Sequence, residues 1–159
     1  MAAAAHNPAR INPHLSRRAK LQSGLLPGHL GTHLRRADQA VFAHFQKALQ
    51  DVELTPGEFG ILLLIYENDG LSQTELGNAI GVDRSTVVTL IDRFEHNNVV
   101  ARHPSPIDRR THALSLTPAG RQLMQTLIPR IEAHERAIAS RLSPAEQLQL
   151  IELLSRIAV

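Results

Sequence analysis

The sequence predicts a mainly helical fold of the α+β class, with four helices, a β-hairpin and two further helices in that order. Apolar residues recur at spacings of three and four over most of the chain, which is typical of helices with one buried side. Three capping boxes, in which Ser or Thr is followed three residues later by Glu, mark helix starts at Thr55, Ser72 and Ser143. Between residues 99 and 116 the pattern changes to two short β-rich runs around a proline-containing tip.

The composition fits one folded domain with an aliphatic core. The chain has 159 residues, of which 43% are hydrophobic and only 3% aromatic. It has no cysteine, which excludes disulfides, thiolate metal sites and cysteine nucleophiles. The longest strongly apolar run, residues 61–66, is too short to span a bilayer, so we expect a cytoplasmic protein without membrane contact. A net charge of +2 is too small to indicate a nucleic-acid partner by itself.

Residues 1–27 differ from the rest of the chain and are predicted to form a flexible basic arm. They carry four basic residues and no acidic one, and no helical period persists in them. Such an arm either contributes to binding or is an unstructured leader without a function, and both interpretations stay open. Residues 28–159 are predicted to form the folded domain.

The first three helices follow from the apolar pattern and the start signals. The first is expected over residues 27–50, with an apolar stripe along its whole length. Thr55 opens a second helix that stops at residues 68–70. Ser72 opens a short third helix that ends at Gly81.

The remaining elements are equally well marked. Asp83 is the expected N-cap of a fourth helix, which ends near residues 97–98. A hairpin is expected over residues 99–116, with a tip too long for a two-residue turn. Thr117 and Ser143 then open the two last helices.

A helix, a turn containing glycine, a second helix and a hairpin form a winged helix-turn-helix, expected here over residues 54–116. The fourth helix would bury one side and expose the other. The buried side comprises Val87, Leu90, Ile91 and Phe94, and the exposed side carries Arg84, Ser85, Thr86, Thr89 and Arg93. An α-helix fits the major groove of DNA, where arginine and hydroxyl side chains can bind base edges. Taken alone, the same pattern also describes an ordinary solvated surface helix.

The hairpin tip adds a second basic feature. Arg109 and Arg110 follow Asp108 at this tip, far from any core. Guanidinium groups in such a place can enter a minor groove or bind phosphates. Because lysine, serine or glutamate would keep a tip soluble equally well, the two arginines together with the fourth helix favour DNA binding.

Taken together, these segments resemble the MarR family of bacterial regulators. The resemblance is carried by LSQTELGNAIGVDRSTVVTLIDRFE, as the helix-turn-helix, and by DRRTHALSLTPAG, as the wing and the start of the next helix. It covers roughly residues 54–157, and the helix order extends it to about residue 28. It implies a homodimer in which residues 28–53 and 117–159 supply the dimerisation helices, bound to a pseudo-palindromic DNA duplex.

The resemblance also implies roles for individual residues. The three hydroxyl residues of the fourth helix would read bases, and Arg84 would contact the groove or a phosphate. Val88 stands where many members carry a polar or basic residue, although a valine can touch a thymine methyl group. One of the two tip arginines would contact DNA, and Asp108 would hold an arginine in place.

Many members of the family are repressors released by small anionic aromatic ligands, which bind between the dimerisation helices and the DNA-binding lobe. The resemblance therefore implies such an effector here. The stretch SPIDRRTHALSLTPAG is similar to members linked to the catabolism of hydroxycinnamates and related aromatic acids, so an acid or its CoA thioester is expected. Arginine suits a bidentate contact with a carboxylate. The polar residues expected near the ligand are Arg35, Arg36, His44 and Tyr66.

Two other functions stay open on the sequence. His29 and His33 lie at i and i+4 of one helix, a spacing that can bind zinc, so a zinc-sensing regulator is one alternative. Surface or capping histidines are the commoner case, and no metal site is predicted. A helical dimer that acts only through protein partners is the other alternative, although it would not need the exposed arginines. The sequence has no phosphate loop, nucleophile elbow or paired carboxylates, so we predict no enzyme, catalytic residue or cofactor.

Overall fold

The computed structural model describes residues 24–104 and 112–157, and it divides the chain into two compact units, Met1–Arg36 and Ala37–Val159. The described part of the first unit holds a short 3-10 helix, Leu26–Gly28, and the first residues of α1 (Leu30–Ala48). The sequence predicted one helix here. In the structure, His29 has an extended backbone with a ψ angle of 118° and separates the two elements. Residues 1–23 of the predicted basic arm lie outside the described residues.

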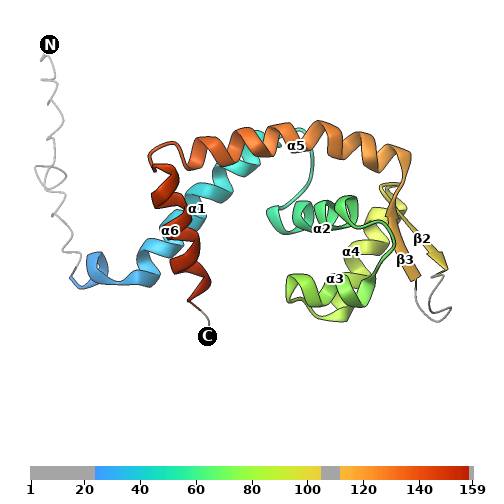
Figure 1. Ribbon diagram of the computed structural model, residues 1–159, viewed down its shortest axis with the longest axis horizontal. Coiled ribbons are helices and arrows are strands. Elements are labelled where there is room, and N and C mark those ends of the chain that lie inside the picture. Colours follow the sequence, from blue (N-terminus) through green and yellow to red (C-terminus); the bar gives the residue numbers. More distant parts are fainter. Residues whose placement is uncertain (1–23, 105–111, 158–159) are drawn as a thin grey trace, which may run out of the picture. The chain divides into compact units, whose positions relative to one another are not determined.

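The second unit contains the helices and strands in the predicted order (Figure 1). They are α2 (Pro56–Glu67), β1 (Leu71–Ser72), α3 (Gln73–Ile80), α4 (Arg84–His96), β2 (Val100–Pro104), β3 (His112–Leu116), α5 (Pro118–Ile138) and α6 (Pro144–Ser155). This arrangement confirms the predicted fold class, a mainly helical chain with a winged helix-turn-helix. The two-residue strand β1 was not predicted, because two residues are too few to show an alternating pattern. None of the described helices has the length and apolarity needed to cross a membrane.

The helix starts are built as the capping boxes predict. Thr55, Ser72 and Ser143 each accept a hydrogen bond from the backbone N–H three residues later, and the Glu at that position accepts one from the cap residue's N–H. Asp83 and Thr117 cap α4 and α5 with their side chains. Each such cap contributes about 1 kcal/mol by satisfying N–H groups that a helix leaves unpaired.

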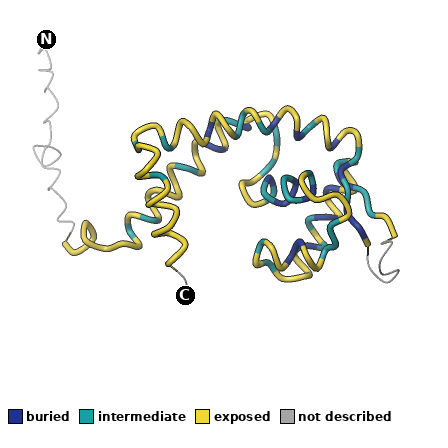
Figure 2. The backbone as a smooth tube through the Cα atoms, in the orientation of Figure 1, coloured by how far each residue is buried: buried dark blue, intermediate teal, exposed yellow. Residues whose placement is uncertain are grey.

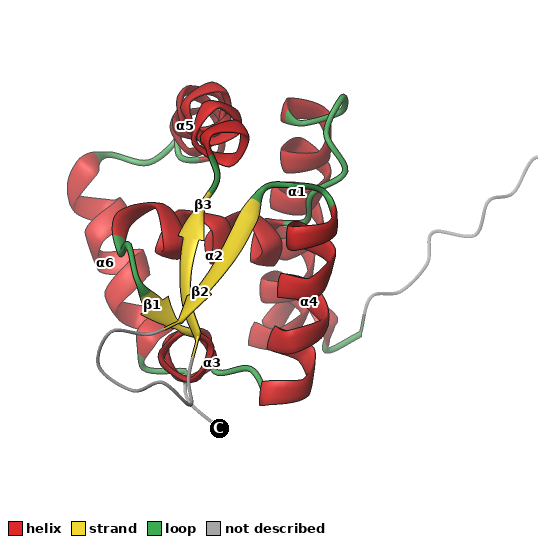
Figure 3. Cartoon of the chain, turned by 90° about the vertical axis from the view of Figure 1, so that its right-hand side faces the viewer, coloured by secondary structure: helices red, strands yellow, loops and turns green. Residues whose placement is uncertain are grey.

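The three strands form one antiparallel sheet in the order β1-β3-β2 (Figure 3). Val100 lies opposite Leu116, and Arg102 lies opposite Leu114. Residues opposite each other share one face of a sheet, so these four side chains lie on the same face. Val100, Leu114 and Leu116 are buried on that face, which therefore packs toward the helices.

The hydrophobic core lies within the second unit, among the end of α1, the helices α2, α3 and α4, the sheet and the first half of α5 (Figure 2). Helix α2 is apolar on most of its sides, as expected for a helix with neighbours around it. Leu62, Val87, Ile91, Leu114 and Leu127 are each completely buried. Burial of such a side chain contributes about 1.5–3 kcal/mol to folding.

Helix α5 starts directly against the end of α4. Thr117 donates its hydroxyl to the carbonyl of Asn98 over 2.6 Å, and its backbone N–H donates to the carbonyl of Val99 over 3.0 Å. Gly120 lies one turn later, where a Cβ atom would come within 2.0 Å of the Val99 oxygen. The joint between the wing and α5 therefore needs glycine at this position.

We expect Gly120→Ala to lower the free energy of unfolding by about 1–3 kcal/mol, because the added methyl group overlaps backbone that cannot easily move. Gly60→Ala is the matched control, since a Cβ there would meet no atom within 4 Å and alanine favours a helix. Urea denaturation followed by circular dichroism gives both values. Equal stability of the two variants would contradict the close contact.

Candidate nucleic-acid interface

Helix α4 separates an apolar side from a polar side, as the sequence predicts. Val87, Ile91 and Phe94 are buried, with exposed fractions of 3% or less. Val88 and Leu90 are half-buried. Of the predicted DNA-contacting residues in the first turns, Arg84, Ser85, Thr86 and Thr89 are exposed, whereas Val88 is the half-buried exception.

The start of α4 is organised around the carboxylate of Asp83. Thr86 donates its backbone N–H to one oxygen over 3.0 Å and its hydroxyl to the other over 2.7 Å. The hydroxyl of Ser85 donates to the first oxygen. These bonds, that of the Ser85 hydroxyl above all, hold the pKa of the Asp83 carboxyl well below its usual range. Asp83 therefore stays ionised and occupies the N-terminus of α4 with its own negative charge.

Arg93 was predicted to lie with the DNA-contacting residues, but its guanidinium is already engaged within the chain. It forms an ion pair with Glu58 of α2 over 2.5 Å and lies 5.3 Å from the centre of the Phe94 ring. Glu58 is only 13% exposed, whereas Arg93 is 46% exposed. Arg93 thus ties α4 to the start of α2 and keeps part of its surface accessible to a ligand.

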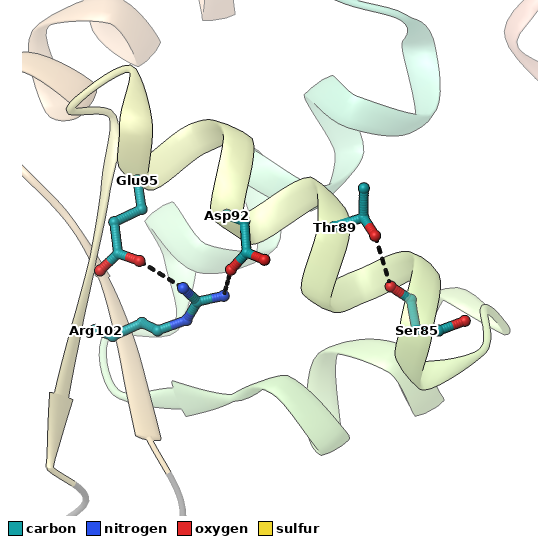
Figure 4. Close-up of polar contacts among 5 residues, drawn as sticks. All are labelled: Ser85, Thr89, Asp92, Glu95 and Arg102. Carbon is teal, nitrogen blue, oxygen red and sulfur yellow. Dashed lines mark hydrogen bonds and ion pairs between the residues drawn. The ribbon is translucent and has the colours of Figure 1, made fainter.

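A second arginine, Arg102, joins the wing to α4 and was missed in the sequence. Its guanidinium binds Asp92 and Glu95 at 2.5 Å each, so β2 is held against the last turns of α4 (Figure 4). Asp92 and Glu95 lie three positions apart on one helix face, and this spacing beside an arginine in the following strand is the signal that could have revealed the contact. The two carboxylates next to a candidate DNA surface are therefore paired with an arginine.

The predicted wing residues Asp108, Arg109 and Arg110 lie outside the described residues, which stop at Pro104 and resume at His112. The strands on either side are paired up to His112 opposite Pro104. Both strands therefore run as far as the described residues reach, and the roles of the tip arginines stay predictions from the sequence.

The four predicted effector residues are divided between the two units, with Arg35 and Arg36 in the first and His44 and Tyr66 in the second. Arg35 and Arg36 lie exposed in the first unit, where Arg36 lines a hollow of about 320 Å³ with Pro27 and His33. Tyr66 lies half-buried on α2 against the core. His44 lies exposed on the part of α1 that belongs to the second unit.

His44 pairs with a histidine that the sequence analysis did not single out. Its Nδ1 lies 2.7 Å from Nδ1 of His134 on α5, and the His134 ring meets Phe45 edge to face. A hydrogen bond between two Nδ1 atoms needs one of them protonated and the other bare. His134 is 3% exposed, and this burial lowers its pKa. The charge of Glu135 opposes the shift, and His44 adds to it.

A second hollow, of about 390 Å³, lies between α2 and α5. Its walls are formed by the apolar side chains of Phe59, Leu63, Ile128 and Ile131. Glu132, Glu135 and Arg136 line its remaining sides. The apolar walls suit a ring, whereas the two carboxylates disfavour an anionic group there.

Of the two histidines considered for zinc, His33 has a local side-chain contact in the structure. The Nε2 atom of His33 lies 2.8 Å from the carbonyl oxygen of Pro27, so the ring caps the 3-10 segment. Among residues 24–104 and 112–157, no three His, Cys, Asp or Glu residues are grouped closely enough to hold a metal ion.

Comparison with known proteins agrees with the winged helix-turn-helix fold. The model of the MarR family matches residues 54–112. A protein assigned to transcriptional regulation of the hcr operon in Thauera aromatica is 38% identical over 149 residues, which cover 93% of this chain and 90% of that protein. The repressor CouR, solved on a 23-mer DNA duplex, has a TM-score of 0.81 and 34% identity, covering 89% of this chain and 100% of that one.

Two solved structures concern ligands of such proteins. CouR bound to p-coumaroyl-CoA has a TM-score of 0.76 and 32% identity, covering 87% of this chain and 97% of that one. BpsR of Bordetella bronchiseptica, whose DNA binding is regulated by 6-hydroxynicotinic acid, has a TM-score of 0.74 and 31% identity, covering 81% of this chain and 92% of that one.

We expect the burial of His134 to make the free energy of unfolding depend on pH. Because the pKa of His134 is lowered in the folded chain, the unfolded chain takes up a proton first as the pH falls below the ordinary value of 6.5. The contribution of His134 is therefore fully present above pH 6.5 and is lost as the pH falls through the folded-state pKa. Urea unfolding at a series of pH values should show a weaker acid loss for His134→Leu than for the parent. Parallel pH profiles would contradict the assignment.

Proposed function

The chain belongs to the MarR family of DNA-binding transcription regulators, and from this membership we propose that it is a homodimeric repressor released by an aromatic acid or its CoA thioester. It acts in the cytoplasm, where its duplex target lies. The observation that carries the proposal is the outward face of α4, which presents Arg84, Ser85, Thr86 and Thr89 opposite the buried Val87, Ile91 and Phe94.

We assign α4 as the recognition helix that enters the major groove. Its hydroxyl residues and Val88 would meet base edges, because the major groove offers a distinct pattern for each base pair. Arg84 would contact the groove or a phosphate. Arg93 and the tip arginines, Arg109 and Arg110, would bind phosphates or enter the minor groove.

A homodimer explains the unusual surface of α6. No residue of this helix is buried in the single chain, although it is rich in leucine and isoleucine. Leu148 is 71% exposed and Ile151 is 64% exposed. Apolar patches of this kind mark interaction surfaces. Two recognition helices related by a twofold axis would read half-sites about 10 to 10.5 base pairs apart in a pseudo-palindrome.

The effector proposal rests on the relatives and on the basic residues of α1. CouR was solved with p-coumaroyl-CoA, and BpsR responds to 6-hydroxynicotinic acid. Arg35 and Arg36 are exposed and suit the carboxylate or phosphates of such ligands. His44 and Tyr66 would supply further polar contacts. Binding would favour an arrangement of the two recognition helices that no longer fits the duplex.

Arg84→Ala should weaken binding to a duplex selected by the parent protein about tenfold or more at low salt. It should also reduce the slope of log affinity against log salt concentration by about the contribution of one phosphate contact. Arg141→Ala is the matched control, since Arg141 is exposed in the turn between α5 and α6. Fluorescence anisotropy of the labelled duplex at several salt concentrations measures both effects. If the two variants bind alike, α4 is not the DNA-contacting helix.

An effector test uses p-coumaroyl-CoA, p-coumarate and 6-hydroxynicotinic acid on the bound duplex. At least one ligand should lower the affinity about 5- to 150-fold, the usual range of coupling between two sites. Arg36→Ala should raise the ligand concentration needed for half-release about tenfold, because a charged hydrogen bond is lost. Intact duplex binding with no response to all three ligands would refute release by an aromatic acid.

A further inference from the structure

The hydroxyl groups on the outward face of α4 share one property, which is that each donates its hydrogen back into the chain. Ser85 and Thr86 donate to the two oxygens of Asp83, the latter over 2.7 Å. Thr89 donates to the backbone carbonyl of Ser85 over 3.0 Å (Figure 4). All of these residues are exposed, so their oxygens remain accessible.

A hydroxyl whose single hydrogen is donated inward can only accept a hydrogen bond from outside. In the major groove, hydrogens are offered by exocyclic amino groups, namely N6 of adenine and N4 of cytosine. Guanine O6 and N7 and thymine O4 are acceptors, so they would face a bare oxygen lone pair. The direction of these hydroxyl bonds therefore matters for which base fits beneath them.

We propose that Asp83 is a positioning residue that fixes Ser85 and Thr86 as hydrogen-bond acceptors, so that the first turn of α4 selects adenine or cytosine amino groups. This inference rests on the proposed function and adds the chemical class of the bases read. Arg84 lies beside them and carries only donors, so neighbouring positions of one helix turn would read opposite edge chemistry.

The carboxylate is more than an ordinary helix cap. Accepting the N–H of Thr86 is what a cap requires, and that bond uses one oxygen over 3.0 Å. The two hydroxyl bonds are additional, and they explain why this position needs two oxygens without a hydrogen. Asparagine caps a helix about as well as aspartate, but it offers one oxygen and one NH2 group.

Asp83→Asn therefore separates the two roles. If the oxygen of the new amide keeps the N–H of Thr86, the amide NH2 group takes the place of the oxygen that now accepts from the Thr86 hydroxyl. That hydroxyl would then accept a hydrogen bond from the amide and point its own hydrogen outward. The variant should fold with the same helix content and change its base preference at one position in each half-site.

The first experiment measures the energetic coupling between the Thr86 hydroxyl and single amino groups of the DNA. The full-length protein selects duplexes from a random library, and in the selected duplex each adenine is replaced by purine and each cytosine by 2-pyrimidinone, which removes one amino group at a time. For the parent, one such change per half-site should cost about 3- to 10-fold in affinity, the effect of one hydrogen bond. For Thr86→Val the same change should cost less than about twofold, since the acceptor is already gone.

The second experiment repeats the library selection with Asp83→Asn, and circular dichroism checks its fold. At the position whose amino group depends on Thr86 in the first experiment, the preferred base should change from adenine or cytosine to guanine or thymine. Equal losses for the parent and Thr86→Val at every amino deletion, or an unchanged preference in a folded Asp83→Asn, would overturn the inference while leaving DNA recognition intact. Failure of the parent to enrich any duplex would instead refute the proposed function, and this inference with it.

Discussion

The burial of one side of α4 is the constraint on which the rest of the molecule depends. Val87 and Ile91 are completely enclosed, and α3 packs so closely here that a Cβ atom on Gly77 would lie 3.2 Å from the backbone oxygen of Val82 and 3.4 Å from the Val87 side chain. A helix fixed in rotation on one side has its other side fixed as well, because successive residues are about 100° apart on the 3.6-residue turn. The polar face of α4 thus follows from hydrophobic packing beneath it.

Two joints keep this helix in register with the wing. Arg102 binds both carboxylates of the last turns of α4, and the Thr117 hydroxyl binds the chain just after the helix. These contacts use groups that are only partly buried, so each is worth little by itself. One acts at the middle of β2 and the other just after β3, and together they orient a hairpin that has no large core of its own.

The sequence predicted what local signals encode and missed what depends on distant partners. Capping boxes and the N-caps Asp83 and Thr117 are local, and the structure has them where they were expected. Strand β1 exists only because β3 passes beside it, and the His44–His134 contact joins residues 90 positions apart. The pair of Arg93 with Glu58 was invisible for the same reason. The bonds of Asp83 lie within three residues, yet cap statistics do not reveal which way a hydroxyl hydrogen points.

The central claim, that the outward face of α4 lies in the major groove, can be tested by trapping. The chain has no cysteine, so Thr89→Cys introduces a single thiol on that face. A selected duplex with a small mixed disulfide tethered to cytosine N4 in the major groove should undergo thiol–disulfide exchange with this variant, which joins protein to DNA and releases the small thiol, and Arg141→Cys should not react. Equal trapping of both variants, or trapping of Thr89→Cys only by a tether in the minor groove, would contradict the account.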